Sequence, residues 1–238
     1  MLSRVLVVAL SLLMQLPARD AGSPGHARAS TPSEAERAAP APVRLRPPAA
    51  QAKKVATRFV PGPEGNEARF RVREQLVGFD FPNDAIGKTS QVEGSILIGP
   101  DGKLVTDSSK FTIDLRTLAS DRAQRDNFIR RNTIKTDSFP NAVFVPATAE
   151  GLPAPLPATG EMAFTLTGDM TIHGVTRPTT WQVKATRGAS GAVTGTATTE
   201  FKFGDFGMTI PKVGRVMSVD DKIVLEYDFN LVPQAPVK

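Results

Sequence analysis

Apolar side chains occupy every second position near the end of the chain, at Ile223, Leu225, Tyr227, Phe229 and Leu231. Most of the positions between them are polar, with acidic or amide side chains at 226, 228 and 230. Successive side chains of a strand point to opposite faces, so this pattern gives one apolar and one polar face. A helix would instead repeat its apolar positions every three or four residues. The segment therefore predicts a β-strand with one buried face.

The same alternation recurs along the chain and predicts an all-β domain. It is clear over 110–116, 161–167 and 201–203, and weaker over 55–60, 68–75, 92–98, 142–149 and 178–187. Turn sequences such as Gly99-Pro100-Asp101-Gly102 separate these segments and favour antiparallel pairing. We expect eight or nine strands, with Asp220 and Asp221 in a turn before the last one. Such strands can form a barrel or a sandwich, and the residues alone leave both open.

Two segments favour short helices. Residues 122–131 contain no Gly or Pro, and Ser120 is placed to cap a helix that begins there. Its arginines and aspartates, spaced four apart, suit either a solvated helix face or a basic rim that attracts an anionic membrane surface. A second short helix is expected over 83–88.

The aromatic residues mark a single domain, because the first of them is Phe59 and the last is Phe229. We assign residues 53–234 to this domain. Residues 1–23 have the basic start and short apolar run of a signal peptide, and residues 24–52 are an Ala/Pro-rich segment that predicts a disordered tether. The domain is therefore expected to be exported, to the periplasm or the extracellular space.

Composition removes several classes of function. The chain has no cysteine and only two histidines, which excludes disulfide scaffolds, thiol chemistry and Cys-ligated metals. The net charge of +5 divides into +3 over residues 1–52 and +2 over the rest. Because a nucleic-acid-binding domain concentrates basic charge on its folded part, we expect no nucleic-acid partner.

The residues offer little for catalysis. His173 is the single histidine of the domain, in a segment that predicts the tip of a hairpin. A histidine in such a turn is expected to hydrogen-bond the backbone, with ligand contact as the alternative. No nucleophile elbow, phosphate-binding loop, zinc-protease helix or dinucleotide fingerprint is present. We therefore expect no enzyme, no metal and no resident cofactor.

Apolar side chains on the inner faces of the strands have two interpretations. They fill a core, which is the default for any one of them, or they line a tunnel for an apolar ligand. A long hydrocarbon gains about 0.8 kcal/mol for each buried CH₂ group, so such a tunnel binds it without any charged group.

Several motifs occur in the order typical of one family. They are Val92-Glu93-Gly94-Ser95-Ile96, Phe111-Thr112-Ile113-Asp114, Arg125-Asp126-Asn127-Phe128, Phe139-Pro140-Asn141-Ala142-Val143-Phe144, Gly168-Asp169-Met170-Thr171, Thr171-Ile172-His173-Gly174-Val175-Thr176-Arg177-Pro178 and Asp205-Phe206-Gly207-Met208. Together they resemble the YceI-like family of periplasmic polyisoprenoid-binding proteins, from about Phe70 to Phe229.

The resemblance implies an extended, lipocalin-like antiparallel β-barrel of about eight strands with one or two short helices. It also implies non-catalytic binding, carriage or sequestration of an isoprenoid-type lipid, such as a polyprenol or a quinone tail, in an interior tunnel. A transient membrane contact and a homodimer are further expectations. The competing hypothesis is a filled barrel that serves as an interaction or structural module of the cell envelope, without a small ligand.

The alternation and the resemblance together select the residues expected to contact a ligand. The aromatic candidates are Phe70, Phe111, Phe164, Trp181, Phe201, Phe203 and Tyr227, the aliphatic ones are Ile113, Leu166 and Leu225, and His173 is added from the main motif.

Overall fold

The computed structural model describes residues 56–234, so the expected signal peptide and tether lie outside the described residues. This part of the chain forms ten strands and one α-helix. The strands are β1 Thr57–Pro61, β2 Glu67–Leu76, β3 Asn83–Thr89, β4 Val92–Ile98, β5 Lys110–Asp114, β6 Asn141–Glu150, β7 Gly160–Ile172, β8 Val175–Arg187, β9 Val193–Phe201 and β10 Val216–Gln234, and the helix is α1 Ala123–Phe128.

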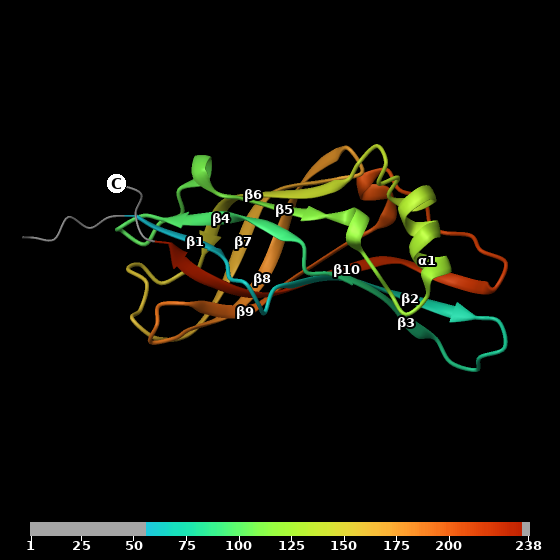
Figure 1. Ribbon diagram of the computed structural model, residues 1–238, viewed down its shortest axis with the longest axis horizontal. Coiled ribbons are helices and arrows are strands. Elements are labelled where there is room, and N and C mark those ends of the chain that lie inside the picture. The colour runs from blue at the N-terminus through green and yellow to red at the C-terminus, as the bar shows by residue number, and fades with distance from the viewer. Residues whose placement is uncertain (1–55, 235–238) are drawn as a thin grey trace, which may run out of the picture. The chain divides into compact units, whose positions relative to one another are not determined.

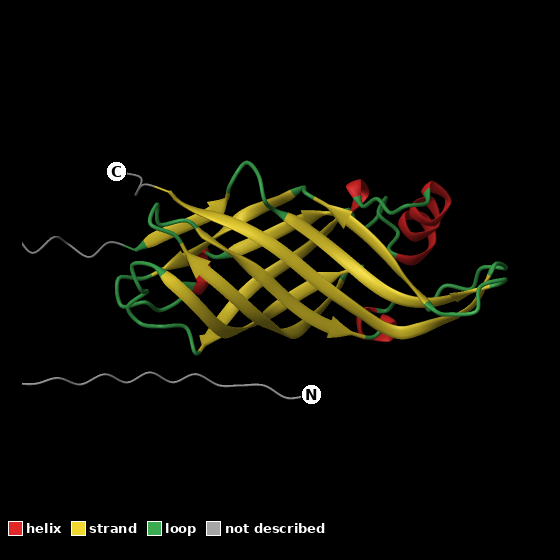
Figure 2. Cartoon of the chain, turned by 90° about the horizontal axis from the view of Figure 1, so that it is seen from below, coloured by secondary structure: helices red, strands yellow, loops and turns green. Residues whose placement is uncertain are grey.

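Eight of the strands form a closed antiparallel barrel (Figures 1 and 2). Neighbours in the sheet follow the order β1, β4, β5, β6, β7, β8, β9, β10, and β1 pairs with β10 to complete the ring. Closure removes the unpaired strand edges that an open sheet would present to other chains. The expected all-β barrel with short helical segments is confirmed.

The remaining two strands extend the wall beyond the closed ring. β10 is long enough to pair with β1 over its last residues and with β2 over its earlier ones. The β2–β3 hairpin therefore projects past the ring at one end (Figure 1). The outer edge of β3 has a single backbone bridge, between Lys88 and Ala119, and α1 lies at this same end. We call it the helix end.

The core follows the alternation of β10. Ile223, Phe229 and Leu231 are buried, and they pack with inward side chains of the other strands. The turn expected at Asp220 and Asp221 is wrong, because both residues lie within β10. The pairing of β10 with β2 shifts register between Val219 and Ile223, so the strand accommodates the polar pair as an irregularity and continues.

The helix expected over 83–88 is wrong as well, because these residues form β3. One edge of β2 presents backbone N–H and C=O groups that need hydrogen-bond partners. β3 pairs with this edge in antiparallel register, from Glu74 opposite Asn83 to Ala68 opposite Thr89. Gly87 faces Phe70 across this pair, and a Cβ at Gly87 would lie 2.3 Å from the Phe70 ring. Glycine thus leaves room for the ring, and pairing between strands overrides the weak local preference for helix.

The helix expected over 122–131 is confirmed in its first part. α1 covers Ala123–Phe128, and a π-helical turn continues it over Ile129–Thr133. Ser120 does not cap it: Arg122 is the N-cap residue and makes no side-chain capping bond. Instead, the Ser120 hydroxyl donates to Asp126 at 2.6 Å, which ties the preceding loop to the helix.

Candidate functional site

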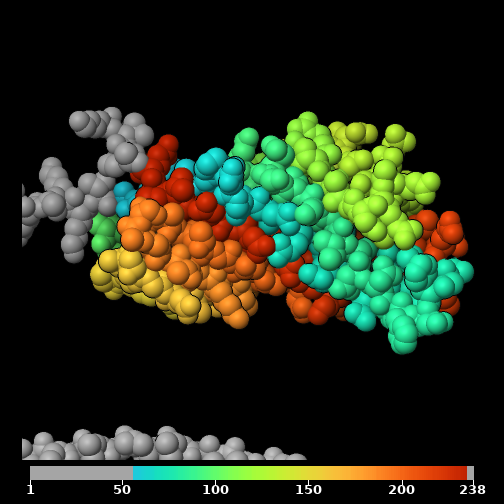
Figure 3. Space-filling view, turned by 60° about the horizontal axis from the view of Figure 1, so that its bottom comes forward, coloured from blue at the N-terminus to red at the C-terminus, as the bar shows by residue number. Residues whose placement is uncertain are grey.

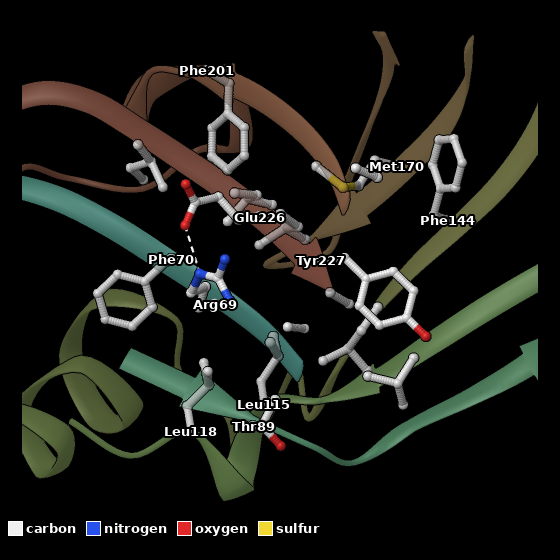
Figure 4. Close-up of a pocket in the computed structure, with 18 of the residues that line it drawn as sticks. Arg69, Phe70, Thr89, Leu115, Leu118, Phe144, Met170, Phe201, Glu226 and Tyr227 are labelled. Carbon is white, nitrogen blue, oxygen red and sulfur yellow. Dashed lines mark hydrogen bonds and ion pairs between the residues drawn. The ribbon is translucent and has the colours of Figure 1, made fainter. Parts of the chain in front are cut away.

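The barrel encloses an apolar cavity of about 500 Å³ (Figure 4). Its wall receives side chains from all ten strands and from the helical segments. The volume lies within the range of protein pockets that enclose small ligands. Its lining is dominated by aromatic and aliphatic carbon, so the cavity favours a ligand with a hydrocarbon surface.

Ten of the eleven residues selected from the sequence line this cavity. They are Phe70, Phe111, Ile113, Phe164, Leu166, Trp181, Phe201, Phe203, Leu225 and Tyr227. Alternation brought them together, since it fixes which side chains of each strand face inward. Their contact with a ligand stays a prediction.

Phe203 reaches the cavity differently from the others. The strand expected over 201–203 ends at Phe201, and residues 203–206 form a 3₁₀ turn. Asp221 of β10 accepts a hydrogen bond from the Phe203 backbone N–H at 3.1 Å, which holds the turn against the barrel. Phe203 is consequently buried in the core although it does not belong to a strand.

His173 is not among the residues that line the cavity, and its contact with a ligand stays a prediction. It forms the turn between β7 and β8 with Gly174, and both residues have positive φ. Its Nδ1 is 3.2 Å from the carbonyl oxygen of Phe206, and its ring packs against Phe139 with centroids 4.9 Å apart. The expected hydrogen bond between the histidine and the backbone is confirmed.

Tyr227 places a phenol ring in the wall and directs its hydroxyl away from the apolar centre. The ring centroid is 6.3 Å from that of Phe111, and the hydroxyl donates to Asn66 Oδ1 at 2.8 Å. Burial raises the pKa of Tyr227, so the phenol stays neutral. The cavity therefore gains aromatic surface without a charge.

The end of the barrel opposite the helix end is covered by the loop between β6 and β7 (Figure 1). Leu152 and Leu156 of this loop line the cavity. Arg187 Nη1 donates to the carbonyl of Pro157 at 3.0 Å, and its guanidinium lies 5.9 Å from the Phe59 ring centroid. These contacts hold the loop over the interior.

The helix end brings polar groups to the cavity. Arg125 of α1 donates to Glu74 Oε1 of β2 at 2.6 Å; Glu74 is buried and Arg125 is half-buried. Arg122, Gln124 and Arg215 also line the cavity here, and all three are exposed. The cavity wall at this end therefore includes guanidinium groups.

Sequence reasoning missed part of this site. Phe144 and Met170 line the cavity (Figure 4), and the alternation of β6 and β7, continued, would have selected them. Residues 193–200 of β9 were not expected as a strand, because several of their inward positions are small or polar: Gly195, Ala197 and Thr199. The ion pair of Glu74 and Arg125 has no sequence signal, since the partners come from separate elements.

The described residues contain no group of three or more His, Cys, Asp or Glu placed to hold a metal ion. Within the same residues, no helix has the length and apolar character to cross a bilayer. The arrangement can enclose an apolar molecule, with positive charge on the wall at the helix end.

Comparison with known proteins agrees with this geometry. The family model described as YceI-like domain matches residues 60–231, almost the whole barrel. The chain belongs to the YceI-like family. Among solved structures, it resembles a polyisoprenoid binding domain from Saccharophagus degradans implicated in plant cell wall breakdown, with a TM-score of 0.56 and 14% identity over 75% of this chain and 98% of that one. It also resembles BcnA of Burkholderia cenocepacia, with a TM-score of 0.50 and 15% identity over 71% of this chain and 96% of that one.

Curated YceI-like relatives match a shorter stretch. A UPF0312 protein of Pseudomonas putida strain W619 is 34% identical over 126 residues, which is 47% of this chain and 61% of the relative. A UPF0312 protein of P. putida F1 is 33% identical over 115 residues, covering 44% and 55%. The match thus spans somewhat more than half the length of these relatives.

Proposed function

We propose that this YceI-like protein binds an isoprenoid-type lipid, such as a polyprenol or a quinone tail, and carries or sequesters it inside the barrel. The observation that carries the proposal is the apolar cavity of about 500 Å³ enclosed by the strands. The binding named for the Saccharophagus degradans domain, which shares the fold, supports the same ligand class.

The chemistry of the wall agrees with such a ligand. Branched hydrocarbon has no hydrogen-bonding groups, and most of the lining side chains have none either, although the buried indole N–H of Trp181 has no partner among the described residues. Each buried CH₂ contributes about 0.8 kcal/mol, so a tail of several isoprene units binds tightly without a charged contact. We propose a binding role rather than catalysis, in an exported protein of the periplasm or extracellular space.

The competing hypothesis requires a filled barrel. A wall of packed side chains meeting at the centre would leave no void, whereas this barrel holds a cavity of about 500 Å³. This cavity supports the ligand-binding proposal over the filled structural module.

Lipid extraction tests the proposal. The full chain is purified without detergent, and bound lipid is identified by mass spectrometry after organic extraction; delipidated protein is then offered long-tailed and short-tailed quinones. We expect an isoprenoid lipid in the purified protein and retention of the long-tailed quinone only. Leu225→Trp places a bulkier side chain in the cavity and leaves less room for the lipid tail. It is expected to reduce retention of the long-tailed quinone about tenfold or more, because several CH₂ contacts are lost.

Val145→Trp is the matched control, because Val145 is exposed on β6 and does not line the cavity. It is expected to retain lipid like the parent protein. Protein that is recovered empty and also ignores added quinones would disprove the proposal.

A further inference from the structure

Exposed apolar side chains gather at the helix end. Six large apolar residues are exposed in the described part of the chain, and five of them lie in two segments. The exposed fractions are 59% for Val77, 60% for Phe79, 82% for Phe81 and 68% for Met217, and Val213 is the fifth. A soluble domain rarely leaves two phenylalanines this open without an interaction that covers them.

The two segments form one surface, which we call the apolar tip: residues 77–82, between β2 and β3, and residues 213–217, where β10 begins. The backbone N–H of Val77 donates to the carbonyl of Arg215 at 3.1 Å, and Leu76 pairs with Val216. Figure 3 shows the teal hairpin and the red start of β10 side by side at this end of the barrel. The apolar tip is therefore held in place by strand pairing.

The apolar tip adjoins the cavity. Leu76, Val213, Arg215 and Val216 line the cavity, and they flank or belong to the apolar tip. A molecule leaving the barrel at the helix end would thus pass next to these exposed side chains.

The charge around the apolar tip is mainly positive. Lys212 and Arg215 are exposed, and neither has a carboxylate within 4.0 Å among the described residues. Arg131 adds an exposed guanidinium group from the helical segment of the same end, and Arg122 adds another that pairs with Asp121 at 3.5 Å. Asp80 is the one acidic residue of the apolar tip. Such a rim attracts an anionic surface.

We propose that the apolar tip is a membrane-docking element, which inserts Phe79, Phe81 and Met217 into the headgroup region of an anionic bilayer. The hairpin projects beyond the barrel (Figures 1 and 2), so a fluid lipid interface can surround it. Basic residues beside exposed aromatic and aliphatic ones match a surface of anionic headgroups above hydrocarbon. The inference rests on the proposed function, because docking there would face the entrance of the cavity toward the lipid.

A fluorescence experiment tests the insertion directly. Trp181 is the single tryptophan of the chain. In the full chain with Trp181→Phe, the change Phe81→Trp puts a sole reporter on the apolar tip, and Val145→Trp in the same background is the control. Vesicles contain either phosphatidylcholine alone or phosphatidylcholine with phosphatidylglycerol. We expect a blue shift of the Phe81→Trp emission, and quenching by brominated acyl chains, with the anionic vesicles; the control is expected to show neither.

Vesicle flotation gives a second readout that leaves Trp181 in place. The double variant Phe79→Ser/Phe81→Ser is expected to lower partitioning onto anionic vesicles about tenfold or more. The variant lacks the two aromatic rings whose burial in the bilayer would favour binding. Val145→Ser is expected to stay within about twofold of the parent. Raising the salt concentration is expected to weaken binding, since the basic rim is solvent-exposed.

The outcomes separate this proposal from the cavity function. Unshifted Phe81→Trp emission with anionic vesicles would overturn docking, while retention of a quinone delivered from detergent would leave the cavity function intact. A blue shift without any lipid retention would uphold docking and remove the cavity function. A blue shift that appears without vesicles and rises with protein concentration would show that a second copy covers the apolar tip, and would overturn the lipid assignment.

Discussion

Charged side chains of β2 and β10 neutralise one another in a cluster centred on Arg69. Arg69 of β2 donates to Glu226 of β10 at 2.6 Å (Figure 4). It also donates to Asp228 of β10 at 2.5 Å. The hydrogen bonds from Arg69 lower the pKa of Glu226 and of Asp228 from their usual values. This cluster joins the projecting hairpin to the long strand.

Replacing Glu226 by Gln tests that cluster through its pH dependence. A carboxyl whose pKa is lower in the folded than in the unfolded protein stabilises above its unfolded pKa, about 4.3 for glutamate, and loses this effect as the pH falls through the folded value. Glu226→Gln is expected to lower the free energy of unfolding by about 1 kcal/mol at pH 7 and by less at pH 3, measured by urea denaturation. Glu200→Gln, at an exposed pair with Lys222, is expected to change it by less than about 0.5 kcal/mol at either pH. An equal loss for Glu226→Gln at both pH values would contradict the role of its charge.

Among the elements, the helical segment and the β2–β3 hairpin depend on each other. β3 has only one backbone bridge along its outer edge, so side chains must complete the contact with α1. The pair of half-buried Arg125 and buried Glu74 supplies this contact, and Asn83 Nδ2 donates to Glu74 at 3.3 Å. This ion pair thus helps to hold α1 at the helix end of the cavity.

Removing one partner of that pair is expected to be costly. Arg125→Ala leaves the Glu74 carboxylate buried without its main partner and is expected to reduce the free energy of unfolding by about 3 kcal/mol. Hydrogen exchange of residues 123–133 is expected to accelerate, because α1 loses its tie to β2. Arg122→Ala is the control in the same segment: its side chain is 58% exposed, and the expected loss is below about 0.5 kcal/mol. Equal stabilities of the two variants would disprove the coupling.

The whole molecule combines a closed wall with an interior that the side chains do not fill. Closure of eight strands fixes a ring wide enough to hold one small ligand. Two regions of different packing follow: the side chains around the cavity, and the dense group at the helix end that includes Phe206, which is fully buried.

Enlarging one aromatic residue in each region is expected to distinguish them. Phe164→Trp enlarges a side chain that borders the void, and we expect less than about 1 kcal/mol of lost stability in thermal and urea unfolding. Phe206→Trp enlarges a side chain that has no space and is expected to cost about 1–3 kcal/mol. A large loss for Phe164→Trp would mean that the cavity is too small to accept the ring, and would weaken the case for a ligand.

Local patterns allowed correct predictions where a residue's role depends on its own strand. Alternation placed Phe111, Leu166 and Tyr227 on the inner wall, and all three line the cavity. The helix expected over 83–88 is wrong because that segment pairs with β2. The turn expected at Asp220 and Asp221 is wrong because β10 continues through both residues as an irregularity in its pairing with β2. His173 was selected from its motif rather than from alternation, and it lies in a turn held against Phe206.

The order of polar and apolar residues by itself determined that this chain forms strands with one buried face, because side-chain direction along a strand is a local property. Only the tertiary structure decided that the ring closes through β1 and β10, that a void remains inside, and that exposed Phe79, Phe81 and Met217 come from two segments joined by strand pairing. These features depend on contacts between residues far apart in the chain, which no local period encodes.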